Sequence, residues 1–142
     1  MKKLFFIGIL LITTLFFSCK KNDSGSPSTG VDFHINITLP NYAALNAIGG
    51  WVYYDAQGLR GIIIYRKTST EFMAYERNCT YQPSNSCAQV QVQISGITAI
   101  DSCCGSKFLM ADGSVYSPPA TIALTKYQTT FDAGSSDLHV FN

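Results

Sequence analysis

Residues 32–39 read DFHINITL, and this stretch alternates strictly between polar and apolar side chains. Phe33, Ile35, Ile37 and Leu39 occupy every second position, which places them together on one face of an extended chain. Pro40 follows and has no backbone N–H with which to continue a ladder of hydrogen bonds. The stretch therefore predicts a half-buried β-strand that ends at Pro40.

The same period of two recurs along the rest of the chain, between turn signals made of Gly, Pro and Asp. The run Ile62-Ile63-Ile64 is typical of a strand that is covered on both faces. Further strands are predicted over residues 51–54, 61–66, 71–77, 89–94, 97–100, 108–110, 115–116, 122–131 and 138–141, with at most one short helix over 42–47. Many short strands of this kind predict an all-β fold, a small sandwich or barrel.

The N-terminal residues 1–18, MKKLFFIGILLITTLFFS, predict a bacterial export signal. Two lysines precede an apolar run from Leu4 to Phe17, which is shorter than the roughly 20 residues that span a bilayer. The end of this segment resembles the lipobox of bacterial lipoproteins, in which the following cysteine, here Cys19, is acylated and becomes the new N-terminus. An ordinary signal peptide cut near the same point and an uncleaved anchor are the alternatives.

Residues 19–30 are rich in Ser, Gly and Pro and predict a flexible tether to a folded domain over 31–142. A lipid on Cys19 would place the protein in the bacterial cell envelope, bound to a membrane. Lys20 follows the cysteine where an Asp would favour the inner membrane, so we expect the outer membrane.

The charged side chains exclude nucleic acid as the main partner. Ten Lys and Arg stand against nine Asp and Glu in 142 residues, and no basic block is present. Binding to phosphates requires clustered basic side chains that displace counterions. The sequence identifies no protein partner in the envelope.

Apart from Cys19, the chain contains four cysteines, Cys79, Cys87, Cys103 and Cys104. An even number of cysteines outside the cytosol predicts two disulfides, and four cysteines allow three pairings. Pairing the adjacent Cys103 and Cys104 would close a small strained ring, which leaves two pairings open. The spacing does not match the paired ligands of common zinc sites, so zinc is the less favoured alternative.

The sequence around these cysteines resembles the Rieske iron-sulfur domain. Residues 60–66, RGIIIYR, and 71–79, EFMAYERNC, are similar to the strands that lead into the first cluster loop of that family. Residues 103–108, CCGSKF, followed by Asp112-Gly113 and Pro118-Pro119-Ala120, are similar to its second loop. The resemblance covers residues from about 45 to 142 and implies a Rieske-like all-β domain with two cysteine-bearing loops at one end.

The cluster ligands are the point at which the chain departs from this family. Rieske clusters take two Cys and two His, as C-x-H in one loop and C-x-x-H in the other. Cys79 matches the first Cys, but Tyr81 stands at the first His position. In the second loop Asp101 stands at the Cys position and Cys104 at the His position. His34 and His139, the two histidines of the chain, lie outside both loops and are expected to be solvated strand residues.

The resemblance also implies how the cysteines pair. Many Rieske proteins join their two loops by a disulfide, and the corresponding residues here are Cys87 and Cys103. The remaining pair is then Cys79 with Cys104, whose disulfide would replace the metal between the loops. A different possibility is a 2Fe-2S cluster on the four thiolates of Cys79, Cys87, Cys103 and Cys104, which would make the protein an electron carrier. A redox-active disulfide, or Asp101 as a general base, is favoured less.

The interpretation of the sequence is a lipid-anchored protein of the cell envelope with a Rieske-like domain that has lost its cluster. We expect no cofactor, no resident metal and no catalytic residue, and a role as a disulfide-stapled binding or structural module instead of an enzyme. The alternative is an electron-transfer protein with an atypical 2Fe-2S cluster.

Overall fold

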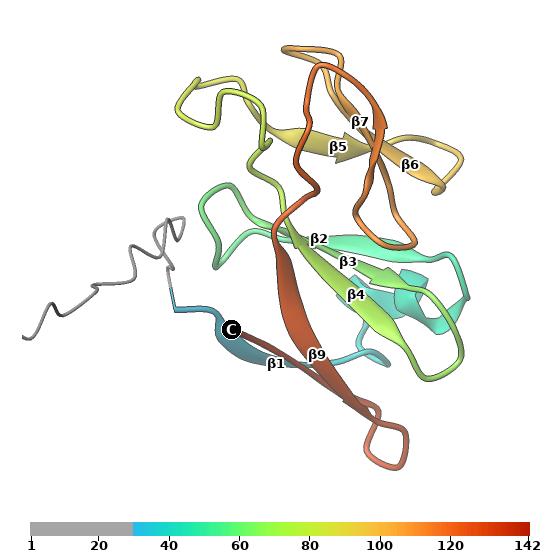
Figure 1. Ribbon diagram of the computed structural model, residues 1–142. Helices are drawn as coiled ribbons and strands as arrows, with labels where there is room; N and C mark the ends of the chain where they lie inside the picture. The colour runs from blue at the N-terminus through green and yellow to red at the C-terminus, as the bar shows by residue number, and fades with distance from the viewer. Residues whose placement is uncertain (1–29) are drawn as a thin grey trace, which may run out of the picture.

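The structure, a computed structural model, describes residues 30–142 and consists almost entirely of antiparallel β-strands (Figure 1). The predicted export signal, Cys19 and most of the predicted tether lie outside the described residues. Within residues 30–142, no helix is long and apolar enough to cross a membrane. The all-β prediction is confirmed.

The strands form two sheets, with η1, a 3-10 helix over Pro40–Asn46, beside the larger one. The six-stranded sheet has the order β1-β10-β9-β4-β3-β2. Its strands are β1 (Asp32–Asn36), β2 (Trp51–Tyr54), β3 (Ile62–Arg66), β4 (Phe72–Glu76), β9 (Lys126–Asp132) and β10 (Asp137–Phe141). The four-stranded sheet has the order β5-β6-β7-β8. Its strands are β5 (Val90–Val92), β6 (Thr98–Asp101), β7 (Lys107–Leu109) and β8 (Val115–Ser117).

Strands β3 and β4 are buried on both faces, as the isoleucine run predicts. Ile62 and Ile64 belong to a first core that also contains Phe33, Leu138 and Val140 from β1 and β10. Ile63 points to the opposite face and belongs to a second core with Phe108 of β7 and with Met110, which follows β7. The two sheets are therefore joined by apolar packing on one face of β3 and β4, which fixes the smaller sheet against the larger.

Three predicted strands are shorter by three residues in the structure. Strand β1 ends at Asn36 because the Asn36 side chain accepts a hydrogen bond from the backbone N–H of Thr38 at 2.9 Å and turns the chain. Strand β5 stops at Val92, and Ile94 is fully exposed instead of facing the core. Strand β9 begins only at Lys126, because the preceding residues bond to the 113 turn, where the N–H of Leu124 donates to Gly113 O at 3.0 Å.

Candidate functional site

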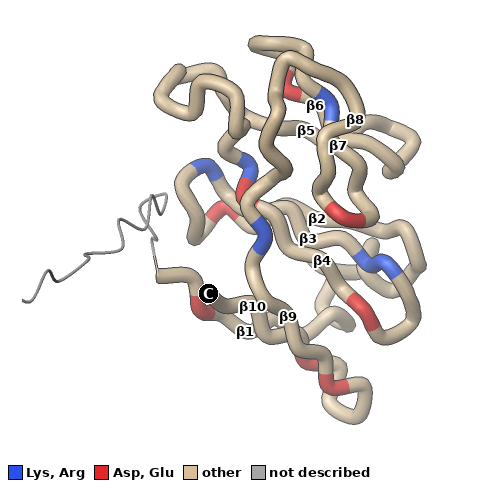
Figure 2. The backbone as a smooth tube through the Cα atoms, viewed as in Figure 1, with Lys and Arg blue, Asp and Glu red and all other residues tan. Residues whose placement is uncertain are grey.

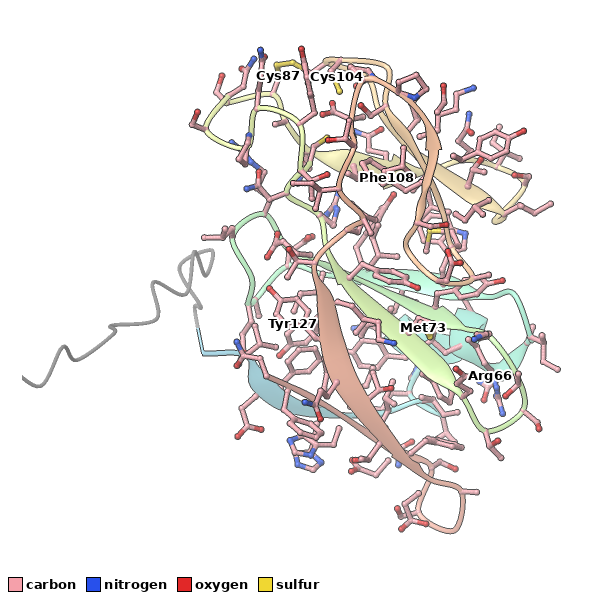
Figure 3. The ribbon with its side chains drawn as sticks, in the orientation of Figure 1. Arg66, Met73, Cys87, Cys104, Phe108 and Tyr127 are labelled. Carbon is pink, nitrogen blue, oxygen red and sulfur yellow. A yellow bond between two sulfur atoms is a disulfide. The ribbon has the colours of Figure 1, made fainter. Side chains whose placement is uncertain are left out.

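Two cysteine-bearing loops lie side by side at the end of the smaller sheet (Figures 1 and 3). The first loop runs from the end of β4 to β5 and is closed at its base by an antiparallel bridge between Asn78 and Gln89. The second loop joins β6 to β7. Because Val90 of β5 pairs with Asp101 of β6, the bases of the two loops are adjacent. The predicted position of the two loops is confirmed.

Arg60 holds the first loop in its place. Its Nη2 donates to Asn85 O at 2.7 Å and its Nη1 donates to Ser86 O at 2.8 Å. Its Nε donates to the side-chain oxygen of Asn78 at 2.8 Å. One guanidinium thus binds both ends of the loop, a contact that the sequence alone did not reveal.

A disulfide joins the two loops. It links Cys87 to Cys103, with 5.7 Å between the α-carbons and a sequence separation of 16. This is the first pairing that the family resemblance implied. In the loop-closure account, a bridge of this length stabilises the fold by about 3 kcal/mol through the unfolded chain.

Cys79 and Cys104 are free thiols in this structure, so the predicted second disulfide is not formed. Their sulfur atoms are 4.0 Å apart, about twice the 2.05 Å length of a disulfide bond. Both sulfurs have other hydrogen-bond partners that account for these positions, chiefly Asp101 and Ser106. Cys79 is buried in the second core, whereas Cys104 is partly exposed.

Asp101 is the fully buried last residue of β6, and its side chain lies between the two thiols. Its Oδ1 accepts a hydrogen bond from the backbone N–H of Cys103 at 2.8 Å, and its Oδ2 is 3.4 Å from Cys104 Sγ. Its carbonyl accepts a hydrogen bond from the N–H of Gly105 at 2.7 Å, where Gly105 has a φ of +83°. Asp101 is thus the turn residue that the sequence predicted, and it is also the centre of the site.

Ser106 provides two further partners of the Cys104 sulfur. Ser106 N–H donates to Cys104 Sγ at 3.4 Å, and Ser106 Oγ lies 3.1 Å from the same sulfur. The N–H of Ala120 donates to Ser106 Oγ at 2.8 Å and so ties the second loop to the following segment. Ser106 is buried, and its role was missed from the sequence because a serine after a glycine is an ordinary turn residue.

Burial of the Cys79 thiol raises its pKa to about 12, and a hydrogen bond to Asp101 adds to the rise. A hydrogen bond from the backbone of Tyr81 acts in the opposite direction. The Tyr81 side chain itself packs against the second core. Tyr81, at a ligand position of the Rieske pattern, thus acts on the site through its backbone.

His34 and His139 lie far from the cysteine loops, opposite each other on β1 and β10. Their rings stack with centroids 4.1 Å apart. His34 Nδ1 is 2.6 Å from Asp137 Oδ2, and His139 Nε2 is 2.7 Å from Asp32 Oδ1. Both histidines are on the sheet surface as predicted, but each has a carboxylate partner that the sequence did not reveal.

The residues at the loops do not fit the 2Fe-2S cluster of a Rieske protein. The two irons require two Cys and two His, and both histidines of the chain belong to the far edge of the larger sheet. The disulfide occupies Cys87 and Cys103, which the four-thiolate alternative would need as ligands. What the loops offer is a single group of three ligand atoms, from Cys79, Asp101 and Cys104, all within 4.8 Å of one another.

Comparison with known proteins identifies the type of fold. No family model matches the chain, and no curated protein matches it. Among solved structures, it is similar to the plasma membrane Rieske protein PetC3 of the cyanobacterium Synechocystis PCC 6803, with 23% identity over 72% of this chain and 95% of that chain and a TM-score of 0.54.

Two weaker similarities are to structures that contain ferredoxins. One is the complex of oxygenase and ferredoxin in carbazole 1,9a-dioxygenase, with 19% identity over 66% of this chain and 81% of that chain and a TM-score of 0.48. The other is the ferredoxin of Sphingomonas yanoikuyae B1, with 18% identity over 65% of this chain and 81% of that chain and a TM-score of 0.42. Strand order, paired cysteine loops and the similarity to the cyanobacterial protein together establish that residues 30–142 adopt a Rieske-type fold.

Proposed function

We propose that this protein is a lipid-anchored module of the bacterial cell envelope whose Rieske-type domain works without a 2Fe-2S cluster. In this proposal the domain is a binding or structural module and not an enzyme. The observation that carries the proposal is the Cys87–Cys103 disulfide. It removes two of the four loop cysteines as ligands and leaves Cys79, Asp101 and Cys104, a set that cannot serve two irons.

The anchor is supported by the sequence of residues 1–19. The similar cyanobacterial structure is that of a plasma membrane protein, which agrees with a membrane location. If Cys19 carries the lipid, Cys19→Ser abolishes labelling by a fatty-acid probe and releases the protein from the membrane fraction. Unchanged labelling of the variant would contradict the anchor. Separation of inner from outer membranes then tests the outer-membrane location.

The alternative function is electron transfer on a 2Fe-2S cluster held by Cys79, Cys87, Cys103 and Cys104. One observation favours it, because the four cysteines lie in two adjacent loops and two of their sulfurs are 4.0 Å apart. It would require the disulfide to be reduced before a cluster is loaded. Cysteine thiolates are the usual ligands of such clusters.

Iron, acid-labile sulfide and free thiols, measured together on the full-length protein in detergent, separate the two functions. The proposal predicts a colourless protein without iron or sulfide. It also predicts that Cys79 and Cys104 react with a thiol reagent after denaturation, and that Cys87 and Cys103 react only after reduction. Stoichiometric iron and sulfide, with absorption in the visible region, would overturn the proposal in favour of the electron carrier.

A further inference from the structure

We propose that Cys79, Asp101 and Cys104 form a mononuclear site for one divalent cation of the zinc class. This inference rests on the proposed function, because it requires that no two-iron cluster occupies the loops. The three ligand atoms gather around one point instead of spreading over the two ends of a cluster, since all lie within 4.8 Å of one another. Two sulfurs and one carboxylate oxygen are a ligand set that Zn²⁺ accepts.

Two of the three distances between the ligand atoms agree closely with one tetrahedral ion, and the third is within 4.8 Å. Zinc binds thiolate sulfur at about 2.3 Å and carboxylate oxygen at about 2.0 Å, which sets two sulfurs about 3.8 Å apart and a sulfur and an oxygen about 3.5 Å apart. In the structure, the sulfurs of Cys79 and Cys104 are 4.0 Å apart, and Cys104 Sγ is 3.4 Å from Asp101 Oδ2. An ion can therefore enter between these atoms with only small side-chain shifts.

The groups around the three ligands hold them in place. The backbone N–H of Cys103 binds Asp101 Oδ1 and leaves Oδ2 directed at the sulfurs. The N–H of Ser106 donates to Cys104 Sγ at 3.4 Å. Hydrogen bonds of this kind orient metal ligands and reduce the charge that a thiolate must carry.

The buried carboxylate of Asp101 also favours a cation. Asp101 is fully buried, and among residues 30–142 it forms no ion pair. Between positions 79 and 124 the charged residues are Asp101, Lys107 and Asp112 (Figure 2). Arg60 and Arg77 also contact the first loop and β5, where they donate to backbone carbonyls and not to Asp101. Binding of Zn²⁺ would release the two thiol protons to solvent and leave two thiolates and one carboxylate around a doubly positive ion.

Three protein ligands leave one position of the tetrahedron open. Cys79 and Asp101 are buried, whereas Cys104 is partly exposed, so the open position lies on the side of Cys104. Figure 3 shows Cys104 at the outer end of the molecule, next to Cys87. A zinc ion with three protein ligands and one exchangeable position can bind a water or a small anion there.

The test uses the full-length protein in detergent, kept free of oxygen and of reductants, and titrated with Co²⁺ and Zn²⁺ against a chelator. We expect one ion per chain, and a Co²⁺ spectrum with the thiolate charge-transfer and tetrahedral d–d bands. Cys104→Ser should remove about half of the charge-transfer intensity. Asp101→Asn should weaken Zn²⁺ binding by more than the roughly 10-fold to 100-fold that loss of a supporting group costs.

The control is the double substitution His34→Asn with His139→Asn. Asp32, His34 and His139 form the other group of ligand atoms among the described residues, and they lie on the far sheet edge. The control variant should bind one Zn²⁺ with unchanged affinity. Loss of the ion in this variant, or retention of full affinity in a folded Asp101→Asn variant, would overturn the proposal.

Failure of this inference is distinguishable from failure of the proposed function. Iron and sulfide in the untreated protein would overturn both. A protein without a cluster that binds no Co²⁺ or Zn²⁺ would overturn the metal site alone. Near-ultraviolet circular dichroism of each variant shows whether a loss of binding reflects the ligand or the fold.

Discussion

Two buried acidic residues occupy equivalent places in the two halves of the molecule. Glu76 ends β4 and precedes Cys79 by three positions, and Asp101 ends β6 and precedes Cys104 by three positions. The carboxylate of Glu76 accepts hydrogen bonds from the N–H groups of Leu59, Arg60 and Asn78 at 2.7, 3.0 and 2.9 Å, and from the hydroxyl of Tyr127 at 2.9 Å. Asp101 has one N–H donor and otherwise only thiols.

This difference indicates that Glu76 has a structural role, whereas Asp101 keeps an oxygen that is available to a ligand. Four donors satisfy the carboxylate of Glu76. The same bonds hold the 58–60 turn, β9 and the start of the first loop together around this carboxylate. The thiols that face Asp101 are weak hydrogen-bond donors. The Oδ2 atom therefore loses little hydrogen-bond energy when a metal ion replaces the thiol protons.

The largest expected effect follows from converting Glu76 to its neutral isostere. Glu76→Gln places an amide N–H₂ against buried donors and leaves about two of them unpaired, which should lower the free energy of unfolding by about 4 kcal/mol. Asp101→Asn keeps the oxygen that binds Cys103 N–H and directs an N–H₂ donor at the sulfurs. Its free energy of unfolding should therefore fall by about 1 kcal/mol or less. Urea denaturation of both variants measures the difference. Equal losses would show that the two carboxylates play the same part.

The disulfide provides the next effect. The double substitution Cys87→Ser with Cys103→Ser should cost about 3 kcal/mol, because the unfolded chain regains the entropy that the closed loop removes. Arg60 still holds the first loop in this variant, so the β-sheet content should persist. Denaturation of the parent protein with and without reductant measures the contribution of the disulfide to the free energy of unfolding. The stability of the variant should not depend on reductant. A reductant effect in the variant would point to a further disulfide.

The loss of stability at alkaline pH reports on the buried groups that bond to the two carboxylates. Burial raises the pKa of Cys79 from 9.0 to about 12, and burial with the Glu76 hydrogen bond raises that of Tyr127 above its ordinary 10.0. The folded protein then keeps protons that the unfolded chain releases, so stability falls as pH rises above about 9. Cys79→Ser and Tyr127→Phe should each flatten this fall. A free energy of unfolding that is constant between pH 8 and 11 would contradict the assignment.

The smallest effect is a difference in thiol reactivity. At pH 8 iodoacetamide should modify Cys104 before Cys79, because Cys104 is partly exposed and Cys79 is buried with a raised pKa. Peptide mass spectrometry after brief labelling of the native protein reads out both sites. Faster labelling of Cys79 would mean that the first loop opens more readily than the second.

The fold was predictable because its signals are local or shared with a family. The alternation in residues 32–36 and the isoleucine run of β3 are side-chain patterns within single strands, and they match the burial of those strands. The pairing of Cys87 with Cys103 was implied by the resemblance to the Rieske family. Such features can be predicted without knowing which residues are neighbours in three dimensions.

The polar centre of the site was less predictable, because its partners are distant in sequence. Glu76 occupies an ordinary position in an alternating strand, and only the return of residues 59–60 and of Tyr127 makes it a four-donor centre. Asp101 looked like a turn residue and a poor iron ligand, and its place between two thiols appears only when β5 pairs with β6. The expected Cys79–Cys104 disulfide relied on two residues being left over, which fixes neighbours but not bonds.

The mass of the intact, untreated protein under native conditions shows directly whether the two loops hold a cluster. A cluster-free Rieske-type domain with one disulfide predicts the mass of the lipidated chain less two hydrogens, alone or with a single zinc ion in place of two protons. An added mass equal to two irons and two sulfides would contradict the account. A loss of four hydrogens would contradict the free thiols at Cys79 and Cys104.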